Sequence, residues 1–345
     1  MEVNKILSAP KKPVEDGKFI FGIYNTPFEE VNMLDAKKIW KFPVPKFIKQ
    51  LRLAEWEAFQ LWDGHFFIMC VVGVSHIARN AMTEIFVYDN NKETIIFKDF
   101  GLHKKSLLKR ENALISSEVN LKTDKVDYRI INDLGNSNTI SVEVKCGDFE
   151  IYFTGNHQTA TPLCYCMPFA KNRGLYSHKN FVEASGYMKI GDEMINFTKD
   201  ARMNIDDHKG YYPFKNSYDW VTTSTKIDDD FIGLNLTKNQ ILNPEKNNEN
   251  VIWVNGKIYY LPKVTFFRQD DIQKEWKIKD EMGLIDLSFY PTKHDIGFYV
   301  KKLFGFFIIN YYTPIGHLSG TVEVSGKKLK FDNAIAVGER RIGRI

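Results

Sequence analysis

Apolar and polar residues alternate along several segments of the chain, and short turn signals separate these segments. In residues 142–153, for example, apolar residues occupy every second position on both sides of a Cys-Gly-Asp turn. Asn255-Gly256 is the dipeptide best suited to a two-residue turn, because both positions tolerate positive φ. This pattern predicts antiparallel hairpins rather than strand-helix-strand units. The expected hairpins cover residues 83–100, 142–153, 186–197, 251–260 and 320–331.

Two of these hairpins resemble each other. Residues 185–197 match residues 319–331 without a gap, with Ser, Gly and Phe in common and most apolar positions in agreement. An acidic residue within a charged cluster follows each copy, in residues 206–210 and 339–343. Hairpins share turn chemistry, so a chance match is the alternative to a duplication. We favour the duplication and predict an all-β protein of two domains, residues 1–182 and 183–345, with few short helices.

The composition is that of a folded protein with enough apolar side chains for two cores: 345 residues, 43% hydrophobic and 14% aromatic. The net charge of +4 arises from 47 basic and 43 acidic residues spread over the chain, which does not indicate a nucleic-acid partner. Lys104, Lys105, Lys109 and Arg110 form the densest basic cluster. We expect them in a solvated loop.

No feature of the sequence indicates export or a membrane span. The first twelve residues lack the apolar core of a signal peptide, and the longest apolar run is too short to cross a bilayer. We therefore expect a cytoplasmic protein and leave its oligomeric state open. Of the four cysteines, Cys164 and Cys166 lie two apart on one strand face, without zinc or dithiol spacing. We expect all four to be reduced and mostly buried.

Residues 206–220 form the leading candidate site, because two adjacent carboxylates, a histidine, two lysines, three tyrosines and a tryptophan occur within fifteen residues. On a strand Asp207 and His208 would point to opposite faces, unless Lys209-Gly210 bends the segment. Asp206 beside Asp207 would raise one carboxyl pKa if both were buried, which suits a general acid. The structural alternative is an aspartate that bonds loop amides and a histidine that fills a rim.

Other residues are candidates for ligand binding. Tyr211 and Trp220 could form a ring-lined wall, although core packing is the commoner role. The guanidinium of Arg173 suits a carboxylate or phosphate, and the amides from Asn235 to residue 250 either recognise hydroxyls or form turns. The candidate ligand-binding residues are Arg173, His178, Lys179, Lys209, Tyr211, Trp220 and Asn235.

No metal and no nucleotide cofactor is expected. Residues 228–230 lack the alternate spacing of a calcium loop, and no pair of histidines has metal-ligand spacing. The chain contains no phosphate loop, dinucleotide glycine motif or nucleophile elbow. These absences disfavour covalent hydrolases and nucleotide enzymes.

The sequence resembles the bacterial family of the domain of unknown function 2804 over most of its length. The resemblance implies no assigned activity. It does imply that residues 51–62 form a strand, whereas intrinsic propensity favours a helix in residues 45–62. The matching strings are residues 51–60, 168–174, 176–179, 206–213, 218–220, 232–236, 247–250 and 320–338.

At greater distance, the acidic residue, histidine and glycine of residues 206–210, with the later Asp219-Trp220, are similar to a motif of AttH-like and carotenoid-hydratase-like proteins. That resemblance implies two lipocalin-like β-barrels, with Asp207 as the acid, His208 as its partner, and Tyr211 and Trp220 as the wall. Lys209 departs from the motif, since those relatives tend to carry a tryptophan close after the histidine.

Together these observations lead to one main hypothesis and two alternatives. The main one is acid-base chemistry, such as isomerisation, hydration or cyclisation, on a small and largely apolar molecule in a cavity at or near the domain junction. The first alternative is a binding module without turnover that recognises a glycan or lipid. The second is that the polar clusters only hold the two domains together.

Overall fold

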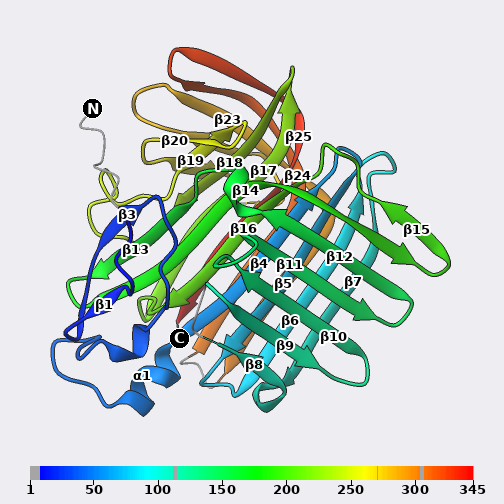
Figure 1. Ribbon diagram of the computed structural model, residues 1–345. Helices are drawn as coiled ribbons and strands as arrows, with labels where there is room; N and C mark the ends of the chain where they lie inside the picture. Colours follow the sequence, from blue (N-terminus) through cyan, green and yellow to red (C-terminus); the bar gives the residue numbers. More distant parts are fainter. Residues whose placement is uncertain (1–7, 112–114, 270, 304–306, 345) are drawn as a thin grey trace. The chain divides into compact units, whose positions relative to one another are not determined.

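The computed structural model describes residues 8–111, 115–269, 271–303 and 307–344 (Figure 1). Antiparallel strands make up most of this part of the chain, and the few helices are short. The predicted all-β class with two β-barrel domains is confirmed. Two compact units follow one another, residues 1–212 and 213–345. The predicted boundary at residues 182 and 183 instead falls inside strand β14 (Arg173–Ile190), whose two halves pair within one sheet.

The first unit is built on a curled sheet in the order β7-β6-β5-β4-β16-β14-β12-β11-β10-β9-β8. The edge strands β7 and β8 are joined by the short helix η2, and Phe97 of β7 stacks on Phe149 of β12 with ring centroids 3.9 Å apart. The sheet therefore nearly closes around one apolar core. Its elements are β4 (Ala54–Trp62), β5 (Phe66–Ser75), β6 (Asn80–Asp89), β7 (Thr94–Lys104), η2 (Lys105–Leu107), β8 (Leu108–Arg110), β9 (Ser117–Lys122), β10 (Val126–Asp133), β11 (Thr139–Cys146), β12 (Phe149–Asn156), η3 (His157–Thr159), β13 (Leu163–Ala170), β14, β15 (Glu193–Asn196) and β16 (Arg202–Gly210).

The N-terminal segment packs beside this sheet in a smaller core of its own. It contains β1 (Val14–Glu15), β2 (Lys18–Phe19), β3 (Gly22–Tyr24), η1 (Met33–Asp35) and α1 (Lys46–Arg52), and β3 pairs with β13. The helix favoured by propensity is thus confirmed only up to residue 52. The strand implied by the family resemblance is confirmed from residue 54, because β4 is held between β5 and β16.

The second unit is a nine-stranded antiparallel sheet in the order β20-β19-β18-β17-β25-β24-β23-β22-β21, curved around a separate core. Its strands are β17 (Lys215–Ile227), β18 (Asp230–Lys238), β19 (Val251–Val254), β20 (Lys257–Tyr260), β21 (Thr265–Arg268), β22 (Trp276–Lys279), β23 (Ile285–Leu303), β24 (Phe307–Val324) and β25 (Lys327–Arg344).

The five expected hairpins are confirmed, including the two that resemble each other. Gly186 and Gly320 occupy the same place in these two hairpins and have φ of 151° and 125°. A Cβ atom would lie 2.1 Å from the Tyr152 carbonyl oxygen at the first position and 2.2 Å from that of Asp286 at the second. The shared glycine therefore has the same role in both units, because it allows the neighbouring strand to approach closely.

The cysteines carry free thiols, and Cys70, Cys164 and Cys166 are buried, as expected from the sequence. Within the described ranges, no helix has the length and apolar character needed to cross a membrane.

Candidate acid-base site in the first unit

Strand β16 places Asp207 and His208 on opposite faces of the sheet. The strand is regular, and Asp207 lies opposite Glu57 of β4 and His178 of β14, while His208 lies opposite Trp56 and Ser177. Successive strand residues alternate between faces. Met203 and Ile205 belong to the core, so Asp207 points to the interior of the sheet and His208 points away from it. The two residues do not form a pair.

Asp207 instead shares a guanidinium with Glu57. Both carboxyl groups are buried, and the Nη2 atom of Arg110 lies 2.9 Å from Glu57 Oε1 and 3.2 Å from Asp207 Oδ1. Arg110 reaches them from the end of β8, with only 12% of its side chain exposed. A single cation therefore bridges two acids that face each other across neighbouring strands.

A third buried carboxylate, Glu55, lies beside this bridge. Its oxygens are 2.5 Å from His76 Nε2, 3.0 Å from Lys209 Nζ and 3.5 Å from Arg110 Nη1. Burial acts to raise the pKa of Glu55, but the hydrogen bond with His76 and the charges of Arg110 and Lys209 outweigh it and lower that pKa. Glu55 is therefore the ionised member that neutralises the nearby cations.

Asp207 behaves in the opposite way. Burial raises the pKa of Asp207 well above its ordinary value, and the charge of Glu57 raises it further, while Arg110 and Lys209 oppose the shift. Burial likewise raises the pKa of Glu57. Two buried carboxyl groups that share one guanidinium hold a proton at a pH where an exposed carboxyl group has lost it.

Two tyrosine hydroxyl groups complete the interior polar cluster. Tyr176 and Tyr128 are fully buried, and neither hydroxyl has a hydrogen-bond partner within the described residues. Burial raises the pKa of both; the charges of Asp207 and Glu57 add to the effect on Tyr176, and that of Glu57 to the effect on Tyr128. Both phenols therefore stay protonated beside the carboxyl pair and are available as donors.

On the other face, His208 belongs to a separate polar cluster. Its ring stacks on Trp56 at 4.8 Å and 12°, and its Nε2 atom lies 2.7 Å from Asp206 Oδ1 and 3.2 Å from Ser177 Oγ. Lys179 also binds Asp206. Burial acts to raise the pKa of Asp206, but the charges of Lys179 and His208 outweigh it and lower that pKa. The pKa values of the adjacent Asp206 and Asp207 are thus shifted in opposite directions.

The remaining candidate residues of the first unit lie apart from the carboxyl pair or have partners of their own. His178 faces the interior, where its Nε2 atom is 2.9 Å from that of His157, and burial with that neighbour lowers its pKa well below the ordinary value. Tyr211 packs in the N-terminal core and donates to the Met33 carbonyl at 3.2 Å. Arg173 begins β14, and its buried Nε atom has no partner in the described part of the chain.

Trp220 and Asn235 belong to the second unit and bind each other. The indole Nε1 atom donates to Asn235 Oδ1 at 2.7 Å, and Asn235 Nδ2 donates to the Glu249 carbonyl at 2.8 Å. Asn250 likewise accepts from the Thr237 amide and donates to the Pro262 carbonyl. These amides therefore fix the loop after β18, which agrees with the turn interpretation.

The second unit carries an ion cluster at the corresponding strands. The second strand of the second similar hairpin continues along β25, which pairs with β17, as the chain after the first similar hairpin continues into β16, which pairs with β4. There Asp219 Oδ1 lies 2.6 Å from Arg268 Nη1 and 2.9 Å from Arg340 Nη1, and Arg268 lies over the Trp276 ring. This cluster has one carboxylate and two guanidinium groups, whereas the bridge in the first unit has two carboxyl groups and one guanidinium group. The ratio of acidic to basic groups is therefore reversed.

Sequence reasoning missed Glu55, Glu57 and Arg110. The glutamates alternate with Trp56 and share the face of Phe59 and Leu61, a pattern that marks buried acids only if the segment is taken as a strand. The expectation of a solvated Arg110 was wrong, because the chain turns back at η2 and brings β8 against β9 with this side chain inward.

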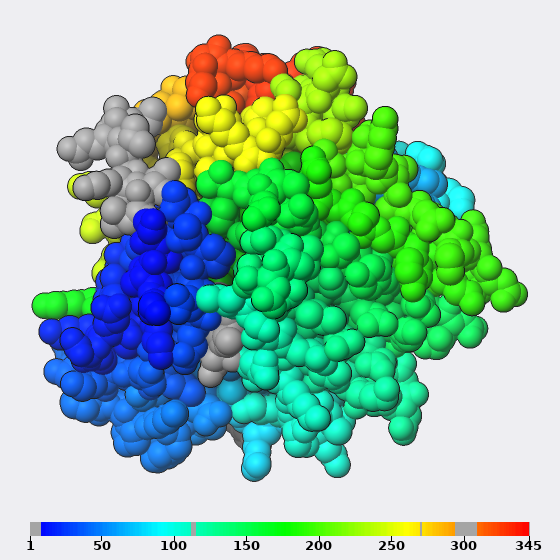
Figure 2. Space-filling model, viewed as in Figure 1, coloured from blue at the N-terminus to red at the C-terminus, as the bar shows by residue number. Residues whose placement is uncertain are grey.

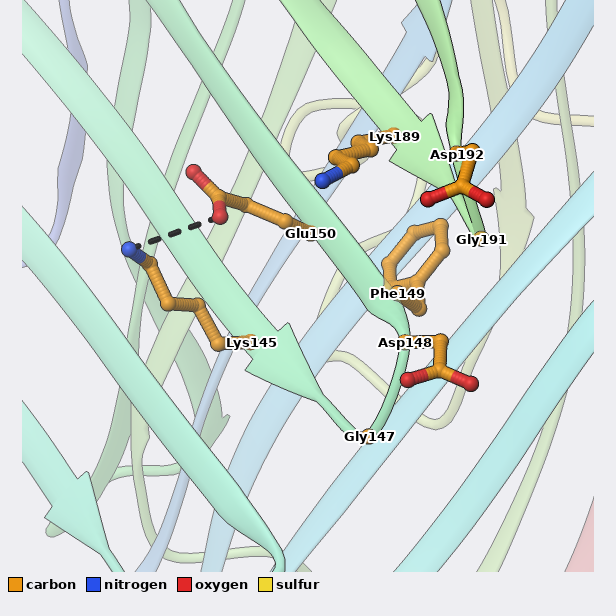
Figure 3. A pocket seen from close by; sticks show the side chains of 8 residues that line it. All are labelled: Lys145, Gly147, Asp148, Phe149, Glu150, Lys189, Gly191 and Asp192. Atoms are coloured by element: carbon orange, nitrogen blue, oxygen red, sulfur yellow. Dashed lines mark ion pairs between the residues drawn. The ribbon is translucent and has the colours of Figure 1, made fainter.

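A surface pocket of about 370 Å³ lies elsewhere in the first unit (Figure 3). The turns of the β11–β12 and β14–β15 hairpins form it, and Lys145 pairs with Glu150 at 3.5 Å on its wall. The pocket lies near Lys189, at the C-terminal end of β14. Asp207 lies opposite His178, near the start of that strand, so the pocket is not part of the carboxyl site.

The fold is shared with solved structures of low sequence identity. CghA with Sch210972 matches with a TM-score of 0.56 and 9% identity, over 85% of this chain and 89% of that one. Kievitone hydratase from Nectria haematococca gives 0.53 and 9%, over 84% and 89%. A putative AttH from Nitrosomonas europaea gives 0.50 and 12%, over 86% and 93%.

The sequence itself matches one family model. The model described as "Domain of unknown function (DUF2804)" matches residues 8–344, and no curated protein matches the chain. This match confirms the family resemblance seen in the sequence, and the AttH structure agrees with the more distant AttH-like resemblance at the level of the fold.

Proposed function

We propose that this chain, which belongs to the DUF2804 family, performs acid-base chemistry on a small, largely apolar molecule inside its first unit. Isomerisation, hydration and cyclisation can each be started by proton transfer to carbon, and Asp207 is the proposed proton donor. The observation that carries the proposal is the Asp207–Glu57 pair, buried, bridged by Arg110 and shifted toward the protonated form. A protonated carboxyl group at neutral pH is what a general acid requires.

The geometry gives each neighbour a role in one proton-transfer cycle. When Asp207 donates its proton, the new carboxylate is stabilised by Arg110 Nη2, already 3.2 Å away. Glu57 raises the pKa of Asp207 and so keeps it protonated before the step. The unused Tyr176 hydroxyl is the proposed donor to an oxygen atom of the substrate. Asp207 regains its proton when the product loses one, or when a water molecule that has added is deprotonated.

His208 has no place in this cycle, because it lies on the opposite face with Asp206 and Trp56. Lys209 holds Glu55 and acts as a positioning residue. The fold relation to a protein named kievitone hydratase, and to CghA crystallised with Sch210972, supports small-molecule chemistry on this architecture. A glycan-binding role has less support, since Trp220 and the loop amides satisfy one another.

Solvent deuterium provides a test that does not require the substrate to be known. We expect the wild-type protein, incubated in D2O with a small-molecule extract of bacterial cells, to place deuterium at carbon in at least one compound, detected by mass spectrometry after back-exchange into H2O. Asp207→Asn should abolish this label. Asp192→Asn, at an exposed turn, is the matched control and should retain it. Labelling that persists in Asp207→Asn would contradict the proposed role.

A further inference from the structure

One stretch of the first unit combines basic and aromatic residues without any acid. Residues 36–54, called here the basic-aromatic segment, contain six basic residues and no aspartate or glutamate. The segment runs from the end of η1 through a loop with two prolines into α1, at the beginning of β4. The basic residues are Lys37, Lys38, Lys41, Lys46, Lys49 and Arg52.

The backbone of the segment is held firmly by the rest of the unit. Ile39, Val44 and Leu53 are buried in the N-terminal core. Lys49 is also buried, and its Nζ atom donates to the Leu34 and Ala36 carbonyls at 2.5 and 2.7 Å. The side chains that point outward are therefore attached to a well-ordered backbone. Little backbone conformational entropy is lost when these side chains bind a surface.

The outward side chains include three large apolar groups. Phe42 is 61% exposed, Phe47 66% and Leu51 44%, and no other large apolar side chain with a described exposure exceeds the two phenylalanines. Phe47 and Leu51 are four residues apart on α1 and so share one side of the helix. Figure 2 shows this blue N-terminal part at the molecular surface. Exposed apolar groups gathered in this way indicate a binding surface.

The same segment carries four exposed lysines and no acidic residue. Lys37, Lys38, Lys41 and Lys46 are exposed, and none forms an ion pair with a residue that the structure describes. Some other surface lysines of the first unit do form ion pairs, such as Lys12 with Glu30 at 2.8 Å and Lys122 with Asp127 at 2.7 Å. The surface of the basic-aromatic segment is therefore positively charged as well as apolar.

We propose that the basic-aromatic segment docks onto the surface of an anionic phospholipid bilayer. Phe42, Phe47 and Leu51 enter the boundary between headgroups and acyl chains, and the four exposed lysines bind the headgroup phosphates. A bilayer fits better than a protein groove because exposed cations and exposed apolar groups occur together in one segment that contains no acidic residue. The inference does not depend on the proposed activity.

Vesicle sedimentation tests this inference with the full-length chain. We expect binding to vesicles of phosphatidylcholine with 30% phosphatidylserine, much weaker binding to phosphatidylcholine alone, and loss of binding as salt is raised. Each lysine near an anionic surface contributes about a fivefold factor in affinity, so Lys41→Gln with Lys46→Gln should weaken binding about 30-fold. Phe42→Ser with Phe47→Ser should weaken it further.

Exposed residues away from the segment provide matched controls. Met194→Ser with Lys125→Gln should leave vesicle binding unchanged. The proposal is overturned if the wild type fails to bind the anionic vesicles at low salt, or if the segment variants bind as well as the control. It is also overturned if light scattering shows a dimer that Phe47→Ser converts to a monomer, since a second copy would then cover the surface. Circular dichroism verifies that each variant is folded.

Discussion

The adjacent carboxyl groups of Asp206 and Asp207 should respond to pH with opposite signs, and replacing each by asparagine tests this directly. Asp207 has a raised pKa in the folded protein. Below about pH 3.9, the ordinary pKa of aspartate, both the folded and the unfolded chain are protonated there. Above it only the unfolded chain ionises, so the free energy of unfolding falls by about 1.4 kcal/mol per pH unit until Asp207 ionises in the fold.

Asp207→Asn removes this pH-dependent penalty and keeps an oxygen that can accept from Arg110. Relative to the wild type, the variant should therefore gain about 1.4 kcal/mol of stability for each pH unit above 4, up to the folded-state pKa. Asp206 has a lowered pKa, so its contribution is fully present above about pH 3.9 and is lost as the pH falls through the folded-state value. Asp206→Asn should destabilise by about 3–5 kcal/mol at pH 7 because buried Lys179 loses this partner.

Urea unfolding followed by circular dichroism at about pH 2.5, 3.5, 4.5, 5.5, 6.5 and 7.5 measures both effects, with Asp192→Asn as the exposed control. The stability of Asp207→Asn and that of the wild type should diverge as the pH rises. A constant difference between pH 4.5 and 7.5, or one that increasingly favours the wild type, would refute the assignment of a retained proton to Asp207.

Two further predictions concern the bridge and the shared glycine. Arg110→Met should lower the free energy of unfolding by about 3–5 kcal/mol at pH 8 and by less at pH 5, where the freed carboxyl groups take up protons; the same titration measures it, and an equal loss at both pH values would contradict it. Gly147→Ala, at φ of 59° in open space, should lower the free energy of unfolding by about 1–2 kcal/mol from backbone strain alone. Gly186→Ala should lower it by about 1–3 kcal/mol more, because the new methyl group meets the Tyr152 carbonyl. Equal unfolding midpoints for the two variants would contradict this explanation.

The strand pattern could be predicted because its signals are local. Alternation sets the face of each residue, and turn residues set the hairpins, as at Asn255-Gly256, where both residues adopt positive φ. The helix in residues 46–52 and the strand from residue 54 show the limit of this approach. Propensity is continuous across them, and only the pairing of β4 with β16 decides where one ends and the other begins.

The site was predicted only in part for the same reason. Alternation placed Asp207 and His208 on opposite faces, and the structure agrees. The partners of Asp207 depend on the register of β4 against β16, which joins residues 150 positions apart, and on the return of the chain to Arg110. Neither relation leaves a local mark in the sequence. The family resemblance also did not supply them, because it gave His208 as the partner.

Strand β16 separates two different electrostatic environments, one on each face of the sheet. On one side a carboxyl group keeps its proton, and on the other its immediate neighbour stays ionised against a lysine. Slippage by a single position would exchange the two, and would also turn Met203 and Ile205 out of the core. Insertions or deletions within this strand are therefore expected to be far more harmful than most of its point substitutions.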